Sequence, residues 1–471
     1  MALRTRQDIW RIDEWDPILV WYARAVREMQ TRPIADPTSW RYQAAIHEYR
    51  RAFDPLQQPA DVAPAAAEQR RFWSQCQHSS WYFLPWHRWY LYYFEQIVAA
   101  TVVQLGGPEG WALPYWNYSD ATNPDARSLA PEFWAETMPD GSPNALRVED
   151  RNFGNDGAPV GDSADTDLTC LTEPEYTADA TGGSPGFGGP KTRFSHGGGP
   201  VGALEATPHG AMHVAVGGWL GGFNTAGLDP LFWCHHANID RLWVVWRNSD
   251  AQHVDPADPD WLDMTFGFHD ATGAVVTKRI GDCVDTTALD YEYAVTSDPS
   301  LPPAPLESVQ ITEAPMVKRI PEMVGASDRP IELTTQPTST EVAVTAPTGP
   351  GLESLEAPGA TPPRVYINIE NITGQGHPRR YSVFVNDVFA GILPMFGVAE
   401  ATNETDEHPG GGLQYRLDAT KAVQQLQAAG NWDPTTMRVT FVPDDKQVGL
   451  ESMSEAPEPR FQVGRVSVYF A

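Results

Sequence analysis

The chain has 471 residues, 41% of them hydrophobic, and its 61 acidic and 33 basic residues give a net charge of −28. This length exceeds what one domain usually holds, so we expect two domains. The acidic balance argues against nucleic acid or an anionic membrane as a partner, and no window approaches a transmembrane span. The N-terminal residues contain no apolar core of signal-peptide length, and the four scattered cysteines do not suggest a disulfide scaffold. We therefore expect a cytoplasmic protein, although export together with a partner would leave the same sequence.

A helix that begins after Ser39 carries the first candidate ligand. In the run WRYQAAIHEYRRAF, four residues recur at helical spacing and share one face: Trp40, Ala44, His47 and Arg51. His47 is therefore expected to point in the same direction as Trp40, toward the interior. Taken alone, such a histidine is more often a core residue than a metal ligand.

The next stretch, CQHSSWYFLPWHRWYLYYFEQIVAATV, holds His78 and His87. Pro85 prevents one continuous helix from passing through both histidines, so we expect His87 at the start of a buried helix over residues 87–103. The two histidines are nine residues apart across a turn, which lets their rings converge on one point. Cys76 stands two residues before His78.

Residues 105–200 are rich in Gly, Pro, Asp and Asn, which predicts long loops over a helical core. Loops of this length in a compact domain usually form functional walls or lids. His196 lies in a glycine-rich part of this region, and we expect it to be a solvated loop residue.

Two further motifs contain the remaining candidate histidines. His209 and His213 are four residues apart, so both rings would leave one helix face and could hold one metal ion. Glu205 lies one turn before them and projects toward the same side. In DPLFWCHHANIDRLW, Asp229 and the proline after it predict a helix start, and His236 falls in the apolar stripe of that helix.

Six histidines thus form two ordered sets of three: His47, His78 and His87, then His209, His213 and His236. Imidazole ligands suit copper or zinc better than iron or magnesium. A structural zinc site would want four ligands, often with cysteine. Two three-histidine sets with open positions therefore indicate a pair of copper ions that binds O2 between them.

These motifs resemble those of a known family. HSSWYFLPWHRWYLYYFE resembles the first copper segment, copper A, of tyrosinases, polyphenol oxidases and molluscan haemocyanins. PHGAMHVAVGG and DPLFWCHHANIDRLW resemble the second, copper B, and the resemblance covers roughly residues 20–250 in register. It implies that the six histidines are the copper ligands. Of the adjacent pair His235 and His236, the second is the ligand in the family.

Finer features of the resemblance concern individual residues. Cys76 falls where fungal tyrosinases and molluscan haemocyanins carry a thioether to the second copper A histidine, which implies a Cys76–His78 crosslink. Phe223 corresponds to the phenylalanine that lies over the copper site in the plant enzymes. Glu205 matches the glutamate that, with a neighbouring asparagine, holds a water proposed as the base for phenols. The asparagine position is Gly210 here, which argues against efficient hydroxylation of monophenols.

The last third of the chain changes in composition. Residues 299–363 contain many prolines and few aromatics, which predicts a linker, although IELTTQPTSTEVAV could pair as an edge strand. Residues 364–471 alternate apolar and polar positions around one helix that starts at Leu417 and Asp418, which predicts a small β-sandwich. This part resembles, more loosely, the C-terminal domain of plant and fungal polyphenol oxidases, which covers the active site with a blocking side chain. The candidate blocking residues are Leu393, Met395 and Phe396.

These features predict a mainly α catalytic domain over residues 1–298, with a four-helix core that holds a dicopper site, and an all-β C-terminal domain. The implied function is a copper-dependent polyphenol oxidase that uses O2 to oxidise small o-diphenols to o-quinones and could also hydroxylate monophenols. Asp229 and Asp240 are candidates to orient the imidazoles. An o-aminophenol oxidase and a haemocyanin-like oxygen carrier are alternatives, and a zinc-binding structural protein is a third.

Overall fold

The computed structural model describes residues 3–297, 320–345, 364–404, 410–444 and 460–471. This part of the chain divides into two compact units. The first unit comprises residues 3–77, 82–172 and 212–297, and the second comprises residues 78–81, 173–211 and the described residues from 320 onward. None of the described helices is both long and apolar enough to cross a membrane.

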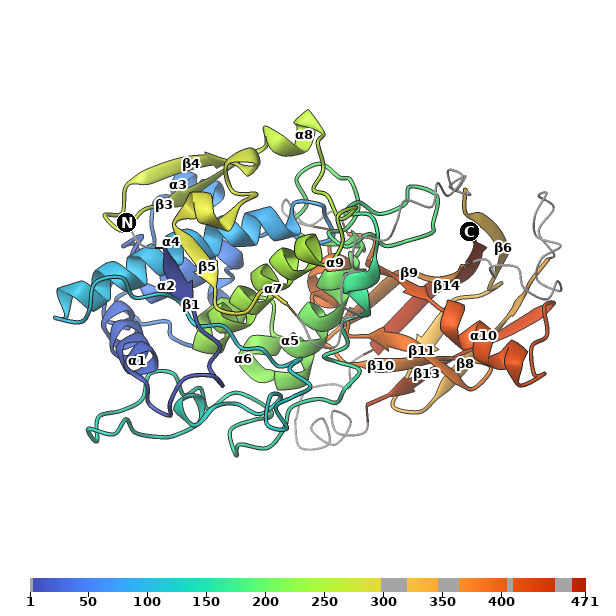
Figure 1. The fold of residues 1–471 in the computed structure, drawn as a ribbon, viewed down its shortest axis with the longest axis horizontal. Helices are drawn as coiled ribbons and strands as arrows, with labels where there is room; N and C mark the ends of the chain where they lie inside the picture. The colour runs from blue at the N-terminus through green and yellow to red at the C-terminus, as the bar shows by residue number, and fades with distance from the viewer. Residues whose placement is uncertain (1–2, 298–319, 346–363, 405–409, 445–459) are drawn as a thin grey trace, which may run out of the picture. The chain divides into compact units, whose positions relative to one another are not determined.

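The first unit is mainly helical. Its helices are α1 (Pro17–Gln30), α2 (Trp40–His47), α3 (Ala66–Phe72), α4 (Phe83–Gln104), α5 (Ala211–Val216, whose first residue belongs to the second unit), α6 (Gly218–Gly221), α7 (Pro230–Ser249) and α8 (Pro259–Leu262). The long helices α4 and α7 pack against each other in its centre (Figure 1). Two small sheets complete the unit. Strand β1 (Arg4–Arg6) pairs in parallel with β5 (Tyr291–Tyr293), and β3 (Thr265–His269) forms a hairpin with β4 (Val275–Arg279).

Side-chain caps begin two of the predicted helices where the sequence places them. The Asp229 carboxylate accepts a hydrogen bond from the Leu231 amide at 2.8 Å, and a proline occupies the first position of α7. At α2, the Ser39 hydroxyl accepts from the amide of Tyr42 at 3.1 Å. Each cap satisfies an amide that the helix itself leaves without a partner. Both predicted helix starts are confirmed.

Two helix boundaries differ from prediction. Helix α4 begins at Phe83, four residues before the predicted start, because Pro85 lies in its first turn, where the missing N–H costs nothing. Helix α2 ends at His47, so Arg51 lies beyond it in a short 3₁₀ turn and does not share its face.

The segment that carries His209 is not one regular helix with α5. Residues Glu205–Gly210 form a π-type turn, and Thr207 is extended inside it, with φ −141° and ψ 125°. Pro208 explains the interruption, since a proline disfavours the helical conformation of the residue before it. The break at Thr207 therefore separates Glu205 from His209, whereas the predicted four-residue spacing of His209 and His213 lies after the break.

Loops dominate residues 105–200, as predicted. Within them the structure has two 3₁₀ turns, Pro131–Phe133 and Thr169–Thr172, and the two-residue strand β2 (Gly199–Pro200). His196 is buried, with 1% of its surface exposed, which contradicts the expectation of a solvated residue. The loop packs inward here because the preceding carbonyl, of Ser195, accepts a hydrogen bond from the amide of His78.

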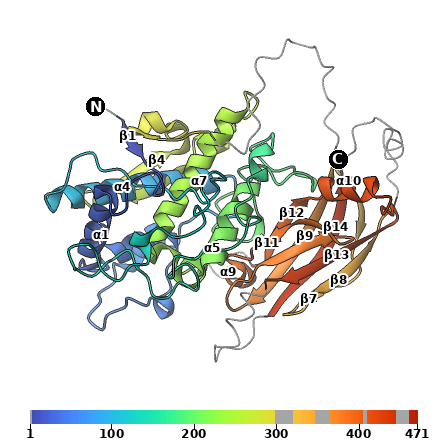
Figure 2. The same ribbon diagram turned by 60° about the horizontal axis from the view of Figure 1, so that its bottom comes forward.

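The second unit contains a two-sheet β-sandwich, whose strands run side by side across Figure 2. One sheet has the order β11–β10–β13–β8, and the other has the order β2–β12–β9–β14–β6, with β7 also paired to β14. Their strands are β6 (Glu322–Ala326), β7 (Ile331–Leu333), β8 (Thr338–Ala343), β9 (Val365–Gln375), β10 (Tyr381–Val385), β11 (Val388–Leu393), β12 (Leu413–Asp418), β13 (Thr436–Pro443) and β14 (Arg460–Phe470). Two helices accompany them, α9 (Val398–Thr402) and α10 (Thr420–Ala428). The apolar positions of the alternating runs form one core, which confirms the all-β prediction.

The predicted linker over residues 299–363 is corrected in its middle. Strands β6, β7 and β8 fall within it and pair with β14 and β13. The edge strand expected in IELTTQPTSTEVAV is β8, whose residues alternate in exposure as an edge requires. Residues 299–319 and 346–363 of the predicted linker lie outside the described residues.

The stretch 173–211 groups with the sandwich, although the sequence places it in the domain of residues 1–298. Strand β2 pairs in parallel with β12, and the guanidinium of Arg416 donates to the carbonyl of Asp179 at 2.5 Å. Ala206 packs against the core of the sandwich. These contacts join residues more than 200 positions apart, which local sequence patterns do not reveal.

Candidate metal centre

Four of the six predicted ligands come together in the first unit. They lie at the end of α2 (His47), in the first turns of α4 (His87), in α5 (His213) and in α7 (His236), and all four are buried. The rings of His87 and His236 stack with centroids 4.5 Å apart. The His47 ring lies 6.0 Å from His87 and 6.4 Å from His236.

The spacing of two copper B histidines fits a shared metal ion. The Nε2 atoms of His213 and His236 are 3.4 Å apart. Two nitrogens at metal-bond length in one tetrahedral site are separated by about 3.3 Å. Because imidazole nitrogens are ligands that copper favours, the donor set present here fits a copper ion.

Backbone carbonyls orient three of the imidazoles. Nδ1 of His87 lies 2.7 Å from the carbonyl oxygen of Phe83, and Nδ1 of His213 lies 2.7 Å from that of Leu220. In the second unit, Nδ1 of His209 lies 3.1 Å from the carbonyl oxygen of Glu205. A hydrogen bond at Nδ1 leaves Nε2 as the nitrogen for a metal.

Burial keeps two of these rings neutral. It lowers the pKa of His87 to about 3 and that of His213 to about 3, while the hydrogen bonds at Nδ1 oppose the change. A metal binds only the deprotonated imidazole. The site therefore presents ligands that need lose no proton near neutral pH.

The other two predicted ligands belong to the second unit. The rings of His78 and His209 are buried and lie 5.7 Å apart. Phe396 contacts both of them in the same unit. Its ring centroid is 6.3 Å from that of His78 and 5.7 Å from that of His209.

The carboxylate of Glu205 contacts the backbone next to His78 in the second unit, although the two residues are far apart in the sequence. Its two carboxylate oxygens are 2.8 and 3.0 Å from the backbone amide of Ser79. Burial raises the pKa of Glu205 to about 8, and hydrogen bonds from the amides of Ser79 and Gly202 oppose the rise. The carboxyl group is therefore largely protonated near neutral pH.

The remaining predicted residues of the first unit surround His47. The ring of Phe223 lies 5.2 Å from that of His47. The sulfur of Cys76 and a ring nitrogen of His47 are within 4.8 Å, and all four cysteines of the chain are buried. The Cys76–His78 thioether stays a prediction.

His235 also lies in this cluster, where the sequence favours only its neighbour. Its ring is buried 4.7 Å from that of His213, and one of its nitrogens is within 4.8 Å of nitrogens of His213 and His236. His236, however, is the member of the pair that stacks on His87 and faces His47. His236 therefore lies beside His47 and His87, two members of the first predicted set of three histidines.

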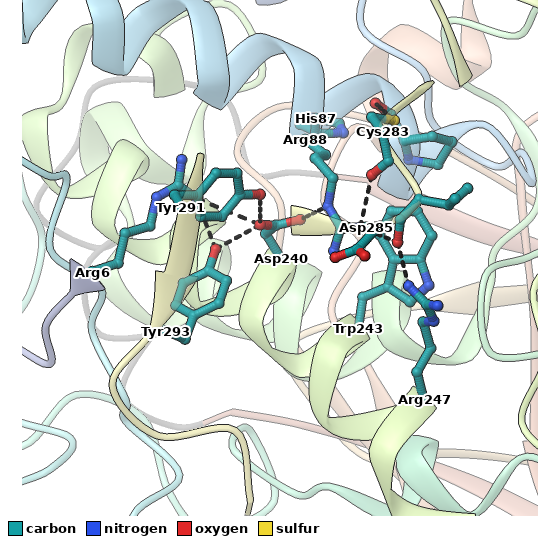
Figure 3. A network of polar contacts seen from close by, with 12 residues as sticks. Arg6, His87, Arg88, Asp240, Trp243, Arg247, Cys283, Asp285, Tyr291 and Tyr293 are labelled. Atoms are coloured by element: carbon teal, nitrogen blue, oxygen red, sulfur yellow. Dashed lines mark hydrogen bonds and ion pairs between the residues drawn. The ribbon is translucent and has the colours of Figure 1, made fainter. Parts of the chain in front are cut away.

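Asp240 does not orient an imidazole in the way that the sequence suggests. Figure 3 shows that its carboxylate receives hydrogen bonds from Arg6 at 3.4 Å, Arg88 at 2.5 Å, and the hydroxyls of Tyr291 and Tyr293, both at 2.6 Å. Arg88 follows His87 on α4, and Asp240 lies one turn after His236 on α7. The carboxylate therefore joins the two ligand-bearing helices to strands β1 and β5.

The partners of this network were not predicted. Arg6 also binds Glu95 at 2.6 Å, and the guanidinium of Arg88 lies 3.7 Å from the ring of Trp243. No periodicity in the sequence links residue 6 with residues 240 and 291. Asp229 has a similar structural role, because it caps α7 and binds Arg151 at 2.6 Å.

The three candidate blocking residues occupy different places in the second unit. Leu393 and Met395 are fully buried in the hydrophobic core of the sandwich. Phe396 lies outside that core, against His78 and His209. Within the second unit, Phe396 is therefore the candidate that reaches predicted copper ligands.

Comparison with known proteins agrees with this site. Residues 37–249 match the family described as the common central domain of tyrosinase, and residues 255–302 match the polyphenol oxidase middle domain. Residues 320–471 match a domain of unknown function, DUF7868. A tyrosinase of Hahella sp. (strain CCB-MM4) is 34% identical over 491 residues, which cover 99% of this chain and 99% of that protein.

More distant relatives come from plants. A chloroplastic polyphenol oxidase of Vitis vinifera is 32% identical over 60% of this chain and 46% of its own length. A structure of latent apple tyrosinase shares the fold over 100% of this chain and 98% of that one, with a TM-score of 0.62 and 22% identity. This chain thus belongs to the tyrosinase and polyphenol oxidase family, whose members are type 3 copper oxidoreductases with a dicopper centre.

Proposed function

We propose that this enzyme oxidises o-diphenols to o-quinones and hydroxylates monophenols only weakly. In the diphenol reaction, two diphenols lose four electrons and four protons in total, and one O2 is reduced to two waters. The copper pair, when bound, supplies the O2 binding and the electron transfer, while the protein fixes its geometry. His47, His78 and His87 would hold one copper ion, and His209, His213 and His236 would hold the other.

The neutral, buried imidazoles support this assignment. Burial lowers the pKa of His87 and of His213, so these two rings can bind a metal without loss of a proton. Backbone carbonyls fix the rings of His87, His209 and His213. The diphenol would stack on the ring of His213 at the copper B side. The surrounding phenylalanines and the stacked pair of His87 and His236 exclude water from the ligands.

The observation that carries the substrate preference is the residue beside Glu205. Position 210 is a glycine, so no side-chain amide is present there to help the carboxylate hold a basic water. The Glu205 carboxyl group already accepts a hydrogen bond from the backbone amide of Ser79, and burial keeps this carboxyl group protonated. A protonated carboxyl cannot accept the proton of a monophenol, and general-base assistance of this kind is worth on the order of 10²- to 10⁴-fold.

We further propose that the C-terminal unit makes the enzyme latent and that Phe396 is its blocking residue. The support is its position within 6.3 Å of one predicted copper A ligand and 5.7 Å of one predicted copper B ligand. Leu393 and Met395 support the sandwich core instead.

A paired-substrate assay tests the substrate preference. Copper-loaded enzyme is first cleaved between residues 299 and 319, before strand β6, so that the strands of the sandwich stay together. A phenol and a catechol with the same side chain are then compared. The catechol should turn over at least about 100-fold faster. Gly210→Asn, measured in the same cleaved form, should raise the ratio of monophenol to diphenol turnover. Equal rates in the wild-type enzyme would contradict the proposal, and an unchanged ratio in Gly210→Asn would place the base elsewhere.

A further inference from the structure

The segment of residues 394–396, which joins β11 to α9, is held in a strained conformation. Met395 has φ 55°, although it is not a glycine, and its side chain is fully buried. Such a backbone conformation is unfavourable for a residue other than glycine and persists only when surrounding contacts enforce it. The contacts that hold this segment therefore decide whether it stays in place.

Gly210 supplies one of those contacts. A Cβ atom added to Gly210 would lie 3.3 Å from Cγ of Pro394 and 3.6 Å from Cβ of Phe396. It would also lie 3.2 Å from the carbonyl oxygen of Glu205. The first and third distances are shorter than ordinary van der Waals contacts, so even one methyl group would press on the segment.

The backbone does not explain the glycine at this position. Gly210 is not among the described glycines with positive φ, and it lies at the end of a helical turn where alanine is favoured. A side chain at this position would instead press on two neighbours, the carbonyl oxygen of Glu205 and Cγ of Pro394.

Tyr415 supplies a second contact from the other side. Its ring is buried on β12, and a hydrogen bond from the backbone amide of Met395 to its hydroxyl oxygen opposes the rise that burial causes in the pKa of Tyr415.

We infer that the missing side chain at Gly210 leaves the space in which residues 394–396 pack. This glycine thereby determines latency as well as substrate preference. One glycine has two consequences: it removes the amide that would assist Glu205, and it makes room for Pro394 and Phe396. This inference rests on the proposed blocking role of Phe396. It also means that Gly210→Asn changes two properties in the intact enzyme, so its substrate ratio is informative only after cleavage.

The test compares Gly210→Ala with the wild type in the full-length, copper-loaded enzyme. Alanine adds a methyl group but no amide. The activation factor is the catechol rate after cleavage divided by the rate before cleavage, each measured on the same variant. Overpacking by one methyl group should lower this factor roughly 5- to 150-fold. Hydrogen exchange of the peptide that contains residues 394–396 should quicken in the same variant.

Two further variants make the test specific. Pro394→Ala removes the Cγ atom that the new methyl group meets, so the double variant Gly210→Ala/Pro394→Ala should recover most of the wild-type exchange protection. Tyr415→Phe removes the hydroxyl that holds Met395 and should also quicken exchange, even if Gly210→Ala fails to fold.

Unchanged exchange in both Gly210→Ala and Tyr415→Phe would overturn the inference. An equal effect of Gly210→Ala with and without Pro394→Ala would also overturn it, because the methyl group would then act elsewhere. Faster hydrogen exchange in these variants would support the packing of residues 394–396 on Gly210. If the cleaved enzyme nevertheless oxidised no catechol, the proposed function would be refuted.

Discussion

Replacing Asp240 by asparagine should destabilise the first unit more than any single surface charge change. Asp240 is 3% exposed and accepts hydrogen bonds from two arginines and two tyrosines (Figure 3). Arg6 would retain its ion pair with Glu95, but the remaining partners of Arg88 would be uncharged: the carbonyls of Cys283 and Val284 and the ring of Trp243. Removing one partner of a buried ion pair costs about 3–5 kcal/mol. For a unit of this size that corresponds to a fall in Tm of roughly 6–20 °C.

Tryptophan fluorescence is a suitable assay for this change. Of the 17 tryptophans, only Trp81 and Trp432 belong to the second unit, so the signal reports unfolding of the first. Copper-free protein avoids a contribution from metal binding. Asp263→Asn is the matched control in the same unit, because its ion pair with Arg279 is exposed and such pairs contribute about 0–1 kcal/mol.

The pH dependence has a definite sign. Burial alone would raise the pKa of Asp240, but Arg88, Arg6 and the two tyrosine hydroxyls outweigh it and hold the pKa below its usual value. A lowered pKa means that the stabilisation is present above the unfolded pKa, about 3.9, and is lost as the pH falls through the folded pKa. The difference in Tm between wild type and Asp240→Asn should therefore shrink below about pH 4. A fall in Tm no larger than that of Asp263→Asn at pH 7 would refute the reasoning.

The remaining predictions concern the metal centre and its cover. His209→Ala should lose about one copper per chain by metal analysis, together with all oxidase activity, because one three-histidine set is broken; full activity would end the assignment. Copper loading should lower the intact mass by about two hydrogens and protect Cys76 from alkylation after unfolding, whereas an alkylated Cys76 in fully active enzyme would exclude the thioether to His78. Phe396→Ala should raise the activity of the uncleaved enzyme on bulky catechols more than on small ones, measured as initial rates. Leu393→Ala is its control, since that side chain lies in the sandwich core, and should lower Tm without this selectivity.

Local chemistry explains what the sequence could predict. The cap at Asp229 and the apolar spacing around His236 are both contained in α7, and they place that ligand correctly on a buried face. The alternation of the last third likewise predicts strands, because each strand carries its own pattern of buried and exposed residues.

Contacts between distant segments explain the rest. The burial of His196 depends on a hydrogen bond between its neighbour Ser195 and His78. Three partners of Asp240, namely Arg6, Tyr291 and Tyr293, come from β1 and β5, and no local pattern in the sequence indicates that these strands pair. The roles of Leu393, Met395 and Phe396 could not be told apart from composition, since all three are apolar and buried.

The most direct test of the central assignment is to measure copper, O2 and quinone together on one preparation of cleaved enzyme with catechol. The family and the two three-histidine sets predict two copper ions per chain, and the proposed reaction predicts one O2 consumed for every two quinones formed. Fewer than two copper ions in fully active enzyme, or O2 that binds reversibly without quinone formation, would contradict the account.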